Sequence, residues 1–268
     1  MHLHFLDPYQ PRLSLVHAAD ARLKLALTLA FILTTSLTPF GAWPIYIFLL
    51  ALILAVEILS SLGVGYVLKR SLLALPFVLA ALPLPFTVEG HELFSVSLGG
   101  WTLTASAEGL TRLVSVALKS WFSVQAAIVL AASTQFPDLL AGMRALGVPR
   151  LLVAMFGLTW RYLFVLVDEA LRLMRARAAR SGTAAGRNTR SGGSVVWRAR
   201  LTGGMVGNLF LRAFERADRI YVAMLSRGYD GEVRTLPSPP MSKSQRLVLG
   251  MGLFSLVLLL LLGLLFWG

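Results

Sequence analysis

Residues 247–267 read LVLGMGLFSLVLLLLLGLLFW, a run without a charged side chain. A run of this length can cross the hydrocarbon core of a bilayer as one helix. The composition agrees, because 56% of the 268 residues are hydrophobic, only 14% are charged and the mean hydropathy is +0.72. An ordinary soluble domain is far less apolar. The sequence therefore predicts an all-α, polytopic membrane protein with about five transmembrane helices and a cytoplasmic helical domain.

Four further apolar segments precede this run. The predicted spans are residues 25–37, 42–59, 71–88 and 109–132. In the third span, Pro76, Pro83 and Pro85 predict kinks, since proline removes a backbone donor and clashes with the preceding turn. Residues 89–108 combine several glycines with short polar and apolar alternation, which predicts an external turn with a small hairpin.

Charge divides the chain into segments of different character. Residues 133–246 hold 18 Lys and Arg against seven Asp and Glu, which is nearly the whole net charge of +12. The predicted domains are an N-terminal membrane domain of four spans (residues 1–132), a cytoplasmic domain (133–245) and a C-terminal transmembrane helix (246–268).

The orientation follows from the basic residues in the connections. Their numbers are three in residues 1–24, none in 39–44, two in 60–70 and none in 89–108. Lys and Arg favour the cytoplasmic side of a membrane. We therefore expect a multi-pass protein of the inner cell membrane with a cytoplasmic N-terminus and an external C-terminus. Its first span is expected to act as the insertion signal.

The sequence carries no set of residues typical of catalysis or metal binding. It has no cysteine and no HExxH, GxSxG or Walker-type motif. His2 and His4 have a spacing that can bind a divalent metal, but exposed terminal histidines more often bind nothing specific. We therefore predict no catalytic residue, no metal site and no cofactor, and we expect the lipid bilayer rather than nucleic acid as the surrounding partner. Any energy source must belong to another subunit.

Two basic residues fall inside the fourth span. Arg112 and Lys119 are seven residues apart, so they share one face of the helix. Charge within a span is a hypothesis of function. One alternative is structural: Arg112 reaches outward, and Lys119 pairs with a carboxylate or with carbonyls in the bundle. Another is a lipid-modifying enzyme that holds an anionic headgroup here, although no acid, His or Ser set accompanies the pair.

Two Arg-centred tripeptides end helical runs in the basic segment. Ala179-Arg180-Ser181 ends the helix predicted over residues 168–180, and Ser226-Arg227-Gly228 ends the helix predicted over residues 205–225. An Arg at a helix C-terminus faces the negative end of the helix dipole. Small flanking residues leave its guanidinium free to enter a partner's groove, although the same pattern is typical of a helix C-cap.

Other parts of the basic segment also have recognisable sequence patterns. Residues 136–148 predict a short amphipathic helix closed by Gly147, and residues 151–167 are apolar apart from Arg161. Residues 183–200 are rich in Gly, Ser, Thr and Arg, which predicts a loop. The basic helices could lie against anionic lipid, or they could form a stiff plug for a soluble partner that offers carboxylates.

Several stretches agree with one known family in order and content. They are His17–Lys24, Leu146–Pro149, Thr159–Tyr162, the Arg-rich run that ends at Ala179-Arg180-Ser181, Gly207–Tyr221 and Met224–Tyr229. In these stretches, which cover nearly the whole chain, the sequence resembles the transmembrane T component of energy-coupling factor (ECF) transporters. It is most similar to the cobalt/nickel-type CbiQ branch.

The resemblance implies a non-catalytic scaffold of an ATP-driven importer. In that family two coupling helices sit in grooves on two cytoplasmic ATPase subunits, and their movement reorients a separate substrate-binding membrane subunit. The implied ATPase-coupling residues are Ala179, Arg180, Ser181, Ser226, Arg227 and Gly228. The branch implies cobalt or nickel as substrate. Alternatives are a T component for a vitamin such as biotin, or a membrane anchor that recruits a soluble protein without transport.

Three positions depart from the family pattern. Ala21 stands where the family commonly has Pro, and Ser181 and Ser226 each replace one residue of the common Ala-Arg-Gly motif. Because every replacement is small, the expected coupling role of the two arginines is retained.

Overall fold

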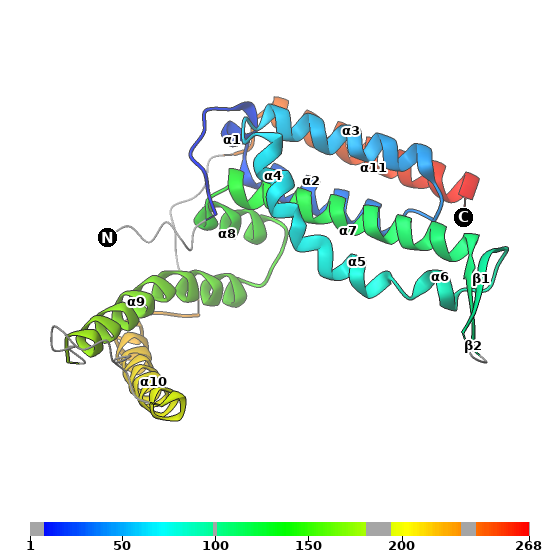
Figure 1. Cartoon of the computed structure of the whole chain (residues 1–268). Helices are drawn as coiled ribbons and strands as arrows, with labels where there is room; N and C mark the ends of the chain where they lie inside the picture. The colour runs from blue at the N-terminus through cyan, green and yellow to red at the C-terminus, as the bar shows by residue number, and fades with distance from the viewer. Residues whose placement is uncertain (1–7, 99–100, 181–193, 232–239, 268) are drawn as a thin grey trace. The chain divides into compact units, whose positions relative to one another are not determined.

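The computed structural model describes residues 8–98, 101–180, 194–231 and 240–267 (Figure 1). Contacts divide the chain into two units. Residues 2–147 and 238–268 form one unit, which we call the bundle, and residues 148–237 form the other, which we call the helix pair. Most of the described residues are helical, as expected for an all-α polytopic membrane protein.

The bundle contains α1 (Leu15–Ala18), α2 (Ala21–Leu37), α3 (Trp43–Leu59), α4 (Val64–Ser71), a 3₁₀ turn (Leu72–Ala74), α5 (Leu75–Ala81), α6 (Leu84–Thr87), α7 (Ala107–Ser133), α8 (Phe136–Ala145) and α11 (Lys243–Trp267). The helix pair contains α9 (Arg150–Arg180) and α10 (Val195–Leu225).

Local signals in the sequence set the first two long helices. The side chain of Asp20 caps α2 by accepting from the backbone N–H of Arg22 at 2.9 Å. The turn between α2 and α3 contains Gly41 at φ +80°, a conformation that costs other residues free energy. The Gly41 N–H donates to Ser115 Oγ at 3.1 Å, which fixes this turn against α7.

The core of the bundle forms around α7. Leu49 of α3 is fully buried and Phe122 of α7 is 1% exposed. Leu256 of α11 belongs to the same apolar cluster, which therefore joins helices from both ends of the chain. The remaining buried members are Phe31, Ala42, Ile45, Tyr46, Ile53 and Ala126. Helix α11 packs on α2, so the last span completes the bundle that the earlier spans begin.

The third predicted span is interrupted, as its prolines predict. Residues 64–87 form three short helices and a 3₁₀ turn instead of one straight helix. Pro76 and Pro85 lie in the first turns of α5 and α6, where a missing N–H is tolerated. The span begins earlier than predicted, because Lys69 and Arg70 belong to α4 and the connecting turn is confined to residues 60–63.

Helix α8 belongs to the bundle. The domain boundary predicted from the sequence instead placed residues 133–147 with the following basic segment. Helix α8 packs against α2, and its Gly142 lies so close to Ala21 and Leu25 that an added Cβ would meet Leu25 Cδ2 at 3.2 Å. Lys24 Nζ donates to the Ser133 carbonyl at 2.9 Å, which joins the start of α2 to the end of α7. The division between the units therefore falls at Gly147, whose φ of +87° ends the turn after α8.

An antiparallel hairpin of β1 (Glu92–Leu98) and β2 (Trp101–Ser106) precedes α7. It lies at the end of the bundle away from α8 (Figure 1). We call these the hairpin end and the α8 end. Ser106 caps α7 by accepting from the Gly109 N–H at 3.0 Å, so the long helix starts directly after the hairpin.

Four segments are long and apolar enough to cross a membrane: residues 64–87, α7, α9 and α11. Helix α3 is a shorter apolar helix, and α2 also has 17 residues. The inclusion of α9 differs from the sequence analysis, which placed this segment in the cytoplasm. The N-terminal half of α9 is strongly apolar, whereas its C-terminal half is rich in Arg.

We predict that Gly109→Ala destabilises the bundle. An added Cβ would lie 2.6 Å from the Leu84 carbonyl oxygen and 2.6 Å from Pro85 Cα, so α6 and α7 must separate. The expected cost is about 1–3 kcal/mol, measured as a lower unfolding temperature in detergent. Gly250→Ala in α11 is the matched control, because its Cβ meets no atom within 4 Å. Equal stability of the two variants would contradict the close packing of α6 on α7.

Candidate functional site

The two Arg-centred tripeptides belong to the helix pair, whose helices are longer than the sequence indicated. Helix α9 continues without a break from Arg150 to Arg180, so the apolar and basic runs are one helix. Helix α10 starts at Val195, because the Ser194 side chain accepts from the Trp197 N–H at 3.2 Å. The predicted loop over residues 183–200 is therefore wrong from residue 195 onward. Residues 181–193 lie outside the described part of the chain.

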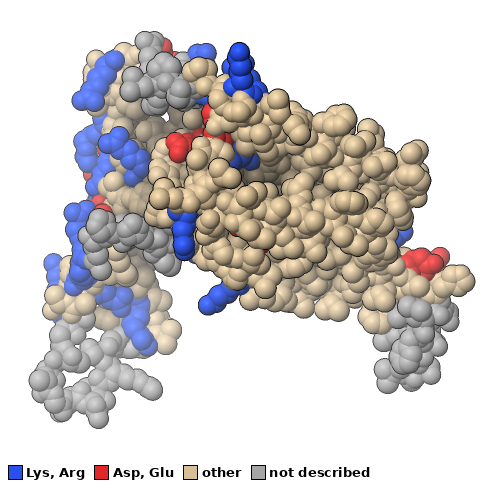
Figure 2. Space-filling view, turned by 90° about the horizontal axis from the view of Figure 1, so that it is seen from above, with Lys and Arg blue, Asp and Glu red and all other residues tan. Residues whose placement is uncertain are grey.

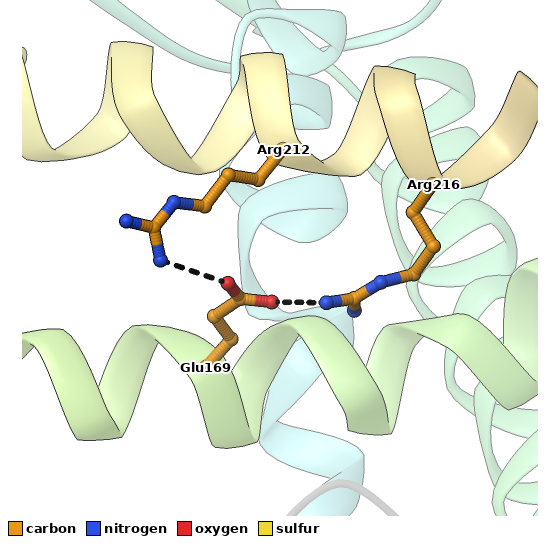
Figure 3. A network of polar contacts seen from close by, with 3 residues as sticks. All are labelled: Glu169, Arg212 and Arg216. Atoms are coloured by element: carbon orange, nitrogen blue, oxygen red, sulfur yellow. Dashed lines mark hydrogen bonds and ion pairs between the residues drawn. The ribbon is translucent and has the colours of Figure 1, made fainter. Parts of the chain in front are cut away.

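One carboxylate of α9 joins the two helices (Figure 3). Arg216 Nη2 donates to Glu169 Oε2 at 2.8 Å, and Arg212 Nη1 donates to Glu169 Oε1 at 3.5 Å. Glu169 is 8% exposed, so its charge is largely removed from water. A desolvated carboxylate requires such partners, because an unpaired buried charge is costly.

A second contact shows the direction in which α10 runs relative to α9. Arg177, two turns beyond Glu169, donates from Nη1 to Thr202 Oγ1 at 3.2 Å. Because Thr202 precedes Arg212 in α10, the chain advances along α9 while it goes back along α10. The helices are therefore antiparallel, and their C-termini lie at opposite ends of the pair. At 1.5 Å per residue, Arg180 and Arg227 are about 35 Å apart along the pair.

The first Arg-centred tripeptide lies at the C-terminus of α9. Ala179 and Arg180 are exposed, whereas Ser181 lies outside the described residues. Arg180 is the last residue of α9, so its positive charge is next to the unpaired carbonyls of the last turn.

The second tripeptide ends α10 in a well-defined C-cap. The N–H of Tyr229 donates to the Met224 carbonyl at 3.0 Å, and the N–H of Gly228 donates to the Leu225 carbonyl at 3.0 Å. Gly228 has φ +80°, which completes a Schellman motif. Ser226, Arg227 and Gly228 are all exposed. The C-cap interpretation is thus correct in geometry, and it leaves the Arg227 side chain on the surface.

The apolar face of α10 is wider than the area that α9 covers. Half-buried residues recur at steps of three and four, namely Met205, Leu209, Ala213, Arg216, Ile220 and Met224. Next to them Phe210 and Phe214 are 68% and 60% exposed. No residue of α10 is fully buried. The pair therefore offers apolar as well as basic surface to other molecules.

Basic side chains gather on the helix pair, while a broad face of the bundle is almost free of charge (Figure 2). This separation matches the charge asymmetry of the sequence. It gives the pair the positive field expected of a surface that meets acidic groups, either on a protein or on a membrane.

The other residues singled out in the sequence lie elsewhere. Lys119 Nζ donates to the Ser36 carbonyl at 3.1 Å, so this lysine pairs with a carbonyl in the bundle. Arg112 is exposed. His2 and His4 lie outside the described residues. In the parts of the chain that the structure describes, no three His, Cys, Asp or Glu residues group together as metal ligands would.

Comparison with known proteins identifies the family. The family model described as cobalt transport protein, CbiQ, matches residues 13–237. The chain belongs to the CbiQ family.

Its curated relatives agree with this assignment. The chain is 30% identical over 172 residues to a cobalt transport protein CbiQ of Rhodobacter capsulatus, covering 64% of this chain and 66% of that relative. It is 30% identical over 242 residues to an energy-coupling factor transporter transmembrane protein EcfT of Thermosediminibacter oceani, covering 86% of each chain. An EcfT of Lactococcus lactis is 28% identical over 233 residues, or 83% of each chain. This CbiQ-family chain is accordingly a transmembrane T component of an ECF-type transporter.

Sequence reasoning about the CbiQ-family chain did not single out Glu169. The signal was present in α10, because Arg212 and Arg216 are four residues apart and therefore share one face of the helix. What the pattern could not reveal is which of the acidic residues on the partner helix lies opposite them.

We predict that Glu169→Gln loosens the helix pair. The free energy of local opening of α9 and α10 should fall by about 1.5–3 kcal/mol, the range for a hydrogen bond to a charged group. Hydrogen exchange measured by mass spectrometry checks this. In a double-mutant cycle, coupling to Arg216→Gln should exceed coupling to Arg212→Gln, because the first contact is 2.8 Å and the second 3.5 Å. Asp168→Asn, at an exposed neighbouring acid, is the matched control; equal effects of the two substitutions would refute the assigned role.

Proposed function

We propose that this chain is the scaffold of an ECF-type importer and that it transmits movement of two cytoplasmic ATPase subunits through Arg180 and Arg227. The chain itself is non-catalytic in this proposal. Ala179, Ser181, Ser226 and Gly228 are the small flanks that let each guanidinium enter a groove, where it pairs with carboxylates.

The observation that carries the proposal is the placement of the two arginines. They lie on the surface at opposite ends of one antiparallel helix pair, about 35 Å apart. A single docking helix would suffice for a membrane anchor, whereas two separated arginines suit two separate ATPase subunits. The ionic contact of Glu169 with Arg212 and Arg216 holds the two helices together, so a displacement at one end is transmitted along the pair.

The membrane partner in this proposal is a substrate-binding subunit. The bundle offers apolar surface on several of its spans, including Leu33, Ile47 and Phe77, which are 60%, 66% and 60% exposed. Bilayer lipid covers part of this surface, and helices of the substrate-binding subunit cover the rest. Cobalt or nickel is the proposed substrate, on the ground of the CbiQ family alone.

The proposed orientation places the α8 end in the cytoplasm. This end contains Lys24, Lys69 and Arg70, whereas the loop over residues 89–108 contains no Lys or Arg. The distribution favours a cytoplasmic N-terminus and an external C-terminus, since positive residues are retained on the cytoplasmic side.

Replacing both arginines by Glu should release the ATPases. In the full transporter, Arg180→Glu with Arg227→Glu reverses two charges that would face carboxylates, so repulsion replaces pairing. We expect normal amounts of this chain in the membrane, loss of the ATPase subunits from a pull-down in mild detergent, and loss of metal uptake by cells.

The matched control changes the same charge elsewhere on the pair. Arg172→Glu with Arg219→Glu alters two exposed arginines within α9 and α10 rather than at their ends. This control should retain the ATPases and at least about half of the uptake, because solvent-exposed charges away from an interface contribute little. Normal uptake by the Arg180 and Arg227 double variant would rule out the coupling role.

Single cysteines test the orientation, because the natural chain contains none. Arg12→Cys and Glu89→Cys place a thiol at an exposed position of the N-terminal segment and of the loop before the hairpin. In intact cells a membrane-impermeant maleimide should label the Glu89→Cys variant and reach the Arg12→Cys variant only after lysis. The reverse labelling pattern would invert the proposed topology.

A further inference from the structure

Two cations of α7 converge on one aromatic ring at the hairpin end of the bundle. Phe40 lies in the turn between α2 and α3. The Lys119 Nζ lies 4.4 Å from the centroid of the Phe40 ring, and the Arg112 Cζ lies 5.8 Å from it. Both separations are within the range of a cation–π interaction. The ring thus brings together two positive charges that are two turns apart on α7.

Part of the role of Lys119 is structural. Its Nζ donates to the Ser36 carbonyl, which belongs to the last turn of α2. The last carbonyls of a helix lack partners within the helix and carry partial negative charge. Lys119 therefore caps α2 with one of the three hydrogens of its ammonium group and has donor capacity left.

Arg112 has donors that the described protein does not satisfy. Within residues 8–98, 101–180, 194–231 and 240–267, its guanidinium forms no ion pair or hydrogen bond. The nearest acid along the helix is Glu108, one turn earlier, but Glu108 Oε2 accepts from the His91 N–H at 2.8 Å. A guanidinium has five N–H donors. Because Arg112 is exposed, these N–H groups can bond to a group from outside the described chain.

The surroundings indicate the depth at which this pair lies. Trp43 at the start of α3 is 43% exposed, and Trp267 at the end of α11 is also 43% exposed. Gly263 packs against Pro39, so the end of α11 lies at the same end of the bundle as the α2–α3 turn. Exposed tryptophans at a bundle end mark the boundary between hydrocarbon and headgroups.

The surface next to the cations is apolar. Leu33 and Leu37 of α2, close in the chain to Ser36 and Phe40, are each 60% exposed. These side chains suit contact with acyl chains rather than with water. The cations thus lie at headgroup depth beside a surface that faces the hydrocarbon.

We propose that Arg112 and Lys119, arranged around Phe40, bind the phosphate of an anionic phospholipid in the leaflet at the hairpin end. Phosphate oxygens accept bidentate hydrogen bonds from a guanidinium and a further bond from an ammonium group. The acyl chains of the same lipid lie along Leu33 and Leu37. Free inorganic phosphate has the same headgroup chemistry, but it lacks the contact with this apolar surface.

Native mass spectrometry of the full chain tests the site. The chain is equilibrated in detergent with equal amounts of phosphatidylglycerol and phosphatidylcholine, and the retained lipids are counted. The natural chain should retain phosphatidylglycerol preferentially. Arg112→Gln should reduce its retention at least about tenfold, because the loss of even one charge-assisted hydrogen bond has this effect. Because Arg112 is exposed, this variant should keep the unfolding temperature of the natural chain.

Two further arms complete the test. Lys69→Gln removes an exposed charge from the α8 end and should leave retention of phosphatidylglycerol unchanged. Excess inorganic phosphate should not displace the lipid, because the apolar contact belongs to the lipid alone. Unaltered retention by Arg112→Gln, an equal loss in Lys69→Gln, or displacement of the lipid by inorganic phosphate would each overturn the proposal.

Discussion

Glu169 of α9 accepts hydrogen bonds from Arg212 and Arg216 of α10, and the helix pair depends on this contact. No residue of α10 is fully buried, so apolar packing contributes less to this pair than to the bundle. Removing a carboxylate from water is costly, but two guanidiniums across the interface offset the cost. The contact also fixes the register of the two helices. Because the helices are antiparallel, that register sets the distance between Arg180 and Arg227.

The bundle is stabilised in a different way. Phe122 and Leu49 are buried in an apolar cluster that draws on α2, α3, α7 and α11. Polar contacts then fix the ends of its helices. Lys24 binds the Ser133 carbonyl at the α8 end, and Lys119 binds the Ser36 carbonyl at the hairpin end. A scaffold that transmits force needs fixed helix ends, since slippage at either end would absorb the movement.

Lys119 also belongs to the proposed contact between the bundle and the lipid bilayer. Lys119 caps α2 and shares the ring of Phe40 with Arg112. In the proposed lipid site, neutralisation of these cations by a phosphate would hold α7 at a defined depth in the bilayer. Under the proposed coupling function, such a fixed position matters, because a bundle that shifted in the bilayer would transmit less of the movement of the ATPase subunits to the substrate-binding subunit.

The sequence by itself determined the helical membrane fold, the positions of the apolar helices in the bundle, including the last one, and the two Arg-centred helix ends. These features rest on local periodicity, on proline positions and on charge, all of which are readable along the chain. It could not determine that α8 packs on α2, that residues 195–200 are helical, or that Glu169 is the acid facing Arg212 and Arg216. These depend on which surfaces meet in space. Only the tertiary structure, through the antiparallel register of α9 and α10, decided that the two arginines lie at opposite ends of the helix pair.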